Sequence, residues 1–146
     1  MKDMVSDRTK VFIDTNIILD YLCDRTDNIP AYETLVEAAL DNRIDLLIAA
    51  HSLTNIFYIT RKRFSETERQ HIIRSICGIC KTQPISGESI EKAITSGYSS
   101  DLEDALQMLC AVESNCDYFV TRDQSLYVNC PVRTCLPDEL IRELSL

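Results

Sequence analysis

The feature of the sequence that most constrains the fold is a change of hydrophobic period close to the N-terminus. Residues 11–13 form a short apolar run of β-forming residues, which is typical of a buried strand. The apolar residues that follow recur at helical spacing: Ile17, Ile18, Tyr21 and Leu22. Asp14, Thr15 and Asn16 lie at the turn between the two segments. Because sites in open α/β sheets form beyond the carboxyl ends of the strands, this turn is a candidate site. The alternative is that its residues only cap the helix.

The rest of the chain repeats the alternation of strand and helix patterns. Further strands are predicted at residues 44–50, 82–86, 117–121 and 132–136, with Pro84 placing the second of these at a sheet edge. Helical patterns separate them, including one at residues 87–95 in which we expect Ile90 and Ile94 to face inward. This order predicts one α/β domain over residues 1–146. Its core is a central parallel β-sheet of about five strands with helices on both faces.

The composition excludes several classes of protein. No apolar run is long enough to span a bilayer, and the N-terminal residues lack the apolar core of a signal peptide, so we expect a cytoplasmic protein with no membrane association. The net charge of −8 argues against general affinity for nucleic acids, because such affinity depends on neutralising phosphates. A local basic patch, or a site that meets phosphate through a metal ion, is still compatible with this charge.

The chain has seven cysteines, an odd number that cannot all pair within one chain. Most lie within apolar patterns, where a free cysteine acts as a small hydrophobic residue. Cys77 and Cys80 form a CxxC motif, but the sequence offers no second pair and only two histidines. We therefore expect neither a zinc site nor a redox site here.

Four carboxylates are expected at one edge of the sheet. Asp14 closes the first strand and Asp123 follows the fourth, and parallel strands bring both to the same edge. Asp101 and Asp104 share one face of a helix at i and i+3. Two like charges about 4 Å apart repel by about 4 kcal/mol at an effective dielectric of 20, so such a cluster favours a bound cation. Oxygen ligands without cysteine or histidine select Mg²⁺ or Mn²⁺. Taken singly, Asp104 reads as a helix N-terminal acid and Asp123 as a turn residue.

Three segments together resemble the signature blocks of PIN-domain proteins: residues 12–16, 101–107 and 121–123. That family has a parallel α/β sheet and consists largely of Mg²⁺- or Mn²⁺-dependent ribonucleases. Many small prokaryotic members are toxins held inactive by an antitoxin, and they commonly form homodimers. The resemblance implies that Asp14, Asp104 and Asp123 are metal ligands in an RNA-cleaving site. It also implies that Thr121 orients the site by hydrogen bonding and that Asn16 supports Asp14.

One position departs from the family pattern. The family usually has a glutamate early in the helix after the second strand, where this chain has Asn55. An amide oxygen can bind a metal or its water but brings no charge, and Asp101 is a candidate for the missing carboxylate. The main interpretation is a metal-dependent ribonuclease. The basic residues 61–63 (Arg, Lys and Arg) are expected to guide RNA to the site; the alternative is that they only end a helix. The alternative function is a weakly active or inactive PIN scaffold that binds RNA or protein.

Overall fold

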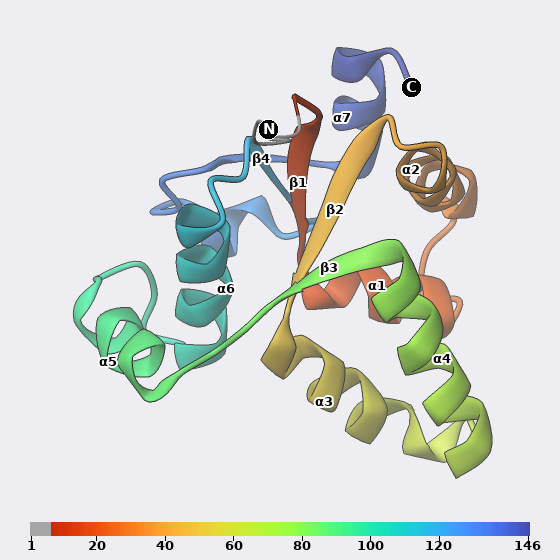
Figure 1. Cartoon of the computed structure of the whole chain (residues 1–146), viewed down its shortest axis with the longest axis horizontal. Coiled ribbons are helices and arrows are strands. Elements are labelled where there is room, and N and C mark those ends of the chain that lie inside the picture. The colour runs from red at the N-terminus through yellow and green to blue at the C-terminus, as the bar shows by residue number, and fades with distance from the viewer. Residues whose placement is uncertain (1–6) are drawn as a thin grey trace, which may run out of the picture.

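The computed structural model describes residues 7–146, and its centre is a five-stranded sheet whose strands all run parallel, in the order β3-β2-β1-β4-β5 (Figure 1). The strands are β1 (Thr9–Ile13), β2 (Ile44–Ala49), β3 (Cys80–Gln83), β4 (Tyr118–Val120) and β5 (Arg133–Cys135). The predicted parallel sheet is confirmed. Every strand therefore ends at the same edge, and β1 and β4, which precede Asp14 and Thr121, are neighbours.

Helices cover both faces of the sheet, as predicted. They are α1 (Thr15–Leu22), α2 (Ile29–Leu40), α3 (Ala50–Ile59), α4 (Glu66–Ile79), α5 (Gly87–Thr95), α6 (Leu102–Glu113) and α7 (Pro137–Leu144), with 3₁₀ turns η1 (Thr60–Lys62) and η2 (Gln124–Tyr127). Because successive strand residues point to opposite faces, Val11 and Ile13 join the core under α1, α2 and α7, whereas Phe12 joins the core under α6. In Figure 1, α6 and α2 accordingly lie on opposite sides of the strands.

Two local predictions were wrong. The third strand ends at Gln83, before Pro84, because proline has no N–H for the sheet; it begins at Cys80, as soon as α4 ends. Its position at the edge is confirmed. Ile90 and Ile94 are 38% and 62% exposed, because α5 packs on α6 through the small residue Ala93 instead.

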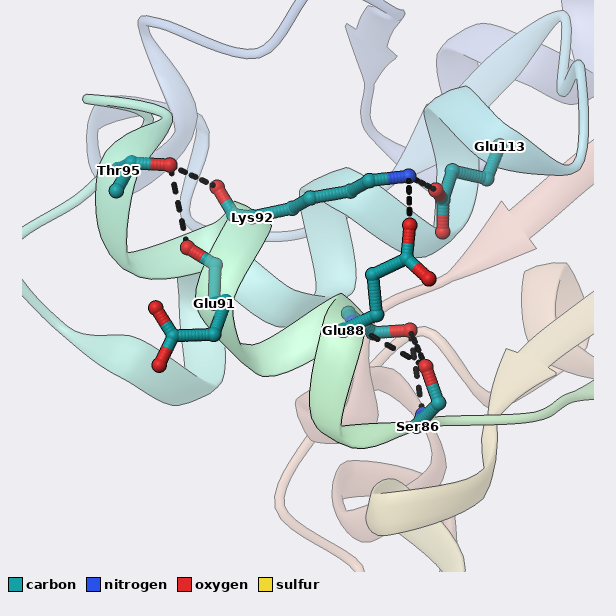
Figure 2. A network of polar contacts seen from close by, with 7 residues as sticks. Ser86, Glu88, Glu91, Lys92, Thr95 and Glu113 are labelled. Carbon is teal, nitrogen blue, oxygen red and sulfur yellow. Dashed lines mark hydrogen bonds and ion pairs between the residues drawn. The ribbon is translucent and has the colours of Figure 1, made fainter.

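Polar contacts hold α5 beside α6 (Figure 2). The Lys92 ammonium lies 3.3 Å from a Glu88 oxygen on the same helix and 3.4 Å from a Glu113 oxygen at the end of α6. Ser86 and Ser89 cap the start of α5 reciprocally. Exposed ion pairs contribute little stability, but they fix the orientation of the helix that leads into the loop before Asp101.

The seven cysteines are all free, and three of them are buried. No helix in residues 7–146 has both the length and the apolar character needed to cross a bilayer.

Candidate active site

Asp14 is the centre of the site. It follows β1 and is 1% exposed, and its carboxylate caps α1 by accepting a hydrogen bond from the Asn16 N–H at 3.4 Å. Three other segments donate to the same carboxylate: Thr121 Oγ1 at 2.8 Å, Gln107 Nε2 at 3.1 Å and the Tyr127 hydroxyl at 3.2 Å. Burial raises the pKa of Asp14, although these hydrogen bonds oppose the shift. Asp14 therefore accepts hydrogen bonds from four segments of the chain, of which only the one from Asn16 is a helix cap.

Thr121 connects Asp14 to Asp123. It follows β4, is fully buried, donates to Asp14 Oδ2 and accepts a hydrogen bond from the Asp123 N–H at 3.0 Å. Between them, Arg122 turns toward α1 and forms an ion pair with the buried Asp20 at 2.6 Å. The Asp123 side chain is 31% exposed and is therefore open to solvent beside the buried Asp14.

The start of α6 brings two more of the predicted carboxylates to this edge. Asp101 caps the helix by accepting a hydrogen bond from the Asp104 N–H at 3.0 Å. Burial raises the pKa of Asp104, and the negative charges of Asp101, Asp14 and Asp123 raise it further. Since charge–charge effects weaken with distance, these residues share one electrostatic environment. The four aspartates chosen from the sequence thus lie at this edge of the sheet, and their role as metal ligands stays a prediction.

Asn55 lies on α3 and faces a carboxylate that the sequence analysis did not select. Burial raises the pKa of Glu103, hydrogen bonding by the Asn55 side chain lowers it, and the charges of Asp101, Asp104 and Asp14 raise it again. Glu103 is therefore the acidic residue next to the position where the family usually has glutamate. The sequence analysis proposed Asp101 as the carboxylate that replaces the missing glutamate, but the Asp101 carboxylate caps α6.

The comparisons with known proteins agree with this architecture. The family model described as PIN domain matches residues 10–125. The chain belongs to the PIN-domain family. A curated relative, ribonuclease VapC1 of Aquifex aeolicus (strain VF5), is 29% identical over 122 residues, which are 81% of this chain and 84% of that protein.

Two solved structures are similar to nearly the whole chain. VapBC-1 of nontypeable Haemophilus influenzae matches with a TM-score of 0.65 at 9% identity, covering 89% of this chain and 99% of that one. DNA-bound VapBC of Salmonella typhimurium matches with a TM-score of 0.64 at 14% identity, covering 88% and 98%. At these identities the likeness demonstrates a shared fold.

Besides Glu103, two residues of this PIN domain were missed in the sequence. Gln107 is 1% exposed and accepts hydrogen bonds from the Thr15 N–H (3.0 Å) and hydroxyl (3.2 Å), which turns its amide nitrogen toward Asp14. The Thr15 hydroxyl also lies 2.6 Å from the Ser52 hydroxyl, which can donate to it. The signal for Gln107 was available, because it is an amide inside an otherwise apolar helix face, three residues after Asp104. No sequence pattern pointed to the second missed residue, Tyr127.

The donor chemistry of the site fits a hard divalent cation, since its side-chain groups are carboxylates, hydroxyls and amides. The imidazole of His51 lies half-buried at the start of α3, and burial lowers its pKa. The spacing, however, is that of hydrogen bonds. Within residues 7–146, no three His, Cys, Asp or Glu side chains are already arranged around a common point as metal ligands. In this arrangement the Tyr127 hydroxyl lies between two of the carboxylates.

Proposed function

We propose that this PIN domain is a metal-dependent endoribonuclease. The observation that carries the proposal is the hydrogen-bond network at the carboxyl edge of the sheet, in which Tyr127 contacts the carboxylates of Asp14 and Asp104 and Thr121 joins the Asp14 carboxylate to the backbone N–H of Asp123. Burial raises the pKa of Asp14 and Asp104, and neighbouring negative charges raise the pKa of Asp104 further, so a bound cation would stabilise the ionised carboxylates. The similarity to a protein named ribonuclease supports phosphodiester hydrolysis as the reaction.

In this mechanism Asp14, Asp104 and Asp123 would hold Mg²⁺ or Mn²⁺, with Asp101 as a further candidate. When bound, such an ion lowers the pKa of a coordinated water and offsets negative charge that builds on the phosphate. The protein supplies the positioning. Thr121 and Gln107 fix the buried Asp14, whereas the more exposed Asp104 and Asp123 lie on the side that a substrate can reach.

The end of α3 offers a basic surface for RNA. Among residues 61–63, only Arg63 forms an ion pair within the part of the chain that the structure describes, with Asp24 at 2.8 Å. The Arg61 guanidinium lies 3.8 Å from the centre of the exposed Tyr58 ring, and Lys62 is exposed. Stacked aromatic and cationic groups are the elements with which proteins bind single-stranded nucleic acid. Arg61 and Lys62 directly follow α3, the helix that carries Asn55, so they would bind RNA that extends along α3 from the carboxylates.

The test is cleavage of single-stranded RNA by the purified protein with and without divalent ions. We expect cleavage in millimolar Mn²⁺, weaker cleavage in Mg²⁺ and none after chelation. Mn²⁺ should also raise the melting temperature, since a ligand at 100 times its Kd stabilises the native state by about 2.7 kcal/mol. A protein that neither cleaves RNA nor responds thermally to Mn²⁺ would contradict the proposal and favour the inactive binding module.

We propose in addition that a protein antitoxin is a partner. A largely apolar cavity of about 210 Å³ opens between α1, α2 and α4, and its lining includes Ile18, Tyr21 and Ile72. Tyr21 at its rim is 38% exposed, which suits a site that an apolar segment of another chain covers. The structures of VapBC from other bacteria support a partner of this kind.

Co-expression with the product of the adjacent reading frame should yield a complex that no longer cleaves RNA, and a lack of any complex would count against this partner. The homodimer stays a prediction.

A further inference from the structure

Tyr127 is the buried residue of the site that the family resemblance does not explain. It ends η2, is 2% exposed, and its ring packs 4.7 Å from the Phe119 ring, which itself stacks on Phe12 at 5.2 Å. These aromatic side chains belong to the core under α6. The core therefore fixes the position of the hydroxyl, and the hydroxyl cannot move far without disturbing the packing of the sheet.

The hydroxyl contacts two expected metal ligands from different elements. It lies 3.2 Å from Asp14 Oδ1 after β1 and 3.0 Å from Asp104 Oδ1 in the first turn of α6. Gln107 Nε2 donates to the hydroxyl oxygen at 3.3 Å, so the hydroxyl proton is left for the carboxylates. Among the described residues, Tyr127 is the one side chain whose hydrogen bonds link Asp14 directly to Asp104.

This arrangement differs from metal coordination in spacing and in strength. Mg²⁺ holds its oxygen ligands at about 2.0–2.1 Å, so two ligand oxygens at right angles around it lie about 3 Å from each other. Here the two carboxylate oxygens lie 3.2 and 3.0 Å from the hydroxyl oxygen, about 1 Å farther than they would lie from a bound Mg²⁺. A hydroxyl has a single proton and donates to one carboxylate at a time, whereas a divalent cation attracts both simultaneously.

We propose that Tyr127 is a positioning residue, whose hydroxyl holds Asp14 and Asp104 together before an ion binds and gives up at least one of these contacts when it does. This inference rests on the proposed function, because it takes both aspartates as ligands of one site. It implies that the hydroxyl stabilises the metal-free site more than the loaded one. The hydroxyl therefore keeps the two aspartates together in the metal-free protein, and it lowers the affinity of the site for metal.

Removing only the hydroxyl should separate these two effects. Tyr127→Phe keeps the aromatic packing, so we expect a lower melting temperature without metal and about tenfold tighter Mn²⁺ binding, the size expected for one hydrogen bond to a charged group. A residue that served only the core would lower the melting temperature and leave Mn²⁺ affinity unchanged. Calorimetric titration of MnCl₂ into the full chain measures the affinity, and a thermal melt measures the stability.

The matched control is Tyr58→Phe, which removes a hydroxyl from a residue that is 62% exposed at the end of α3. It should leave both readouts as in the wild type. Tighter Mn²⁺ binding by Tyr127→Phe supports the proposal, as does a variant that folds only when Mn²⁺ is present. Equal or weaker binding, or a variant unfolded with and without Mn²⁺, overturns it. If Tyr127→Phe binds Mn²⁺ and the wild type does not, the hydroxyl blocks the site and the inference stands. If neither protein binds Mn²⁺, the proposed metal site is wrong, and the inference is wrong with it.

Discussion

Asp14→Asn is expected to abolish metal-dependent RNA cleavage while raising the melting temperature of the metal-free protein. An amide in place of the central carboxylate removes one negative charge and one strong ligand, which should lower the cleavage rate by about 10³-fold or more. The fold should persist, because the hydroxyls of Thr121 and Tyr127 can rotate to accept hydrogen bonds from the new amide nitrogen. The measurements are an RNA-cleavage assay in Mn²⁺ and a thermal melt in a chelator.

The pH dependence of this stabilisation follows from the raised pKa of Asp14. Burial makes the folded-state pKa higher than the ordinary value of 3.8, so the folded protein binds the proton more tightly than the unfolded chain. The contribution of Asp14 to the free energy of unfolding is therefore most favourable below pH 3.8, and it falls as the pH rises through the folded-state pKa. The gain in melting temperature of Asp14→Asn should be small at about pH 4 and larger near pH 7.

A buried aspartate of opposite character provides the control. Asp45 in β2 pairs with Arg8 at 2.9 Å and Lys81 at 3.3 Å, and these partners outweigh burial, so its pKa is lowered. Asp45→Asn should therefore lower the melting temperature near pH 7, and this loss should vanish as the medium becomes strongly acidic. Its RNA cleavage should match that of the wild type. If Asp14→Asn instead lowers the metal-free melting temperature as Asp45→Asn does, Asp14 is a structural cap.

The parts of this molecule that could be predicted from sequence are those that follow from periodicity and topology. The alternation of strand and helix patterns predicts a parallel sheet, and a parallel sheet brings Asp14 and Asp123 to one edge wherever the intervening helices lie. The order of the strands and the pairing of β1 with β4 then make Thr121 the link between them.

The contacts of Tyr127 and Glu103 could not be predicted in this way, because they depend on how separate elements pack. Tyr127 reaches Asp14 and Asp104 only because Phe119 supports its ring, and nothing in the local pattern after Asp123 indicates that support. Glu103 meets Asn55 only because α3 and α6 start beside each other at the sheet edge. The inward orientation predicted for Ile94 failed for the same reason: a small partner, Ala93, was enough to bury the other side of α5.

The second large effect concerns the pair formed by Asn55 and Glu103. Their contact means that one amide and one carboxylate share the region where the family has a glutamate on α3. If this carboxylate adds to the attraction for a divalent ion, Glu103→Gln should weaken Mn²⁺ binding by about tenfold. Asn55→Glu should tighten it and increase cleavage, while the repulsion between two neighbouring carboxylates lowers the melting temperature without metal.

The double variant Asn55→Glu, Glu103→Gln decides how the two positions act, because it exchanges the amide and the carboxylate and keeps the net charge. If both side chains face the same ion, Mn²⁺ affinity should return close to the wild-type value, and the effects of the single changes should not be independent. Asn55 lies inside α3, whose N-cap position is Ala49, so it does not cap that helix. If its side chain does not face the ion, Asn55→Glu should leave the affinity unchanged and the double variant should bind as weakly as Glu103→Gln alone. Calorimetric titration of the four proteins with Mn²⁺, together with cleavage assays at saturating metal, distinguishes a relocated acidic ligand from a site that has lost one.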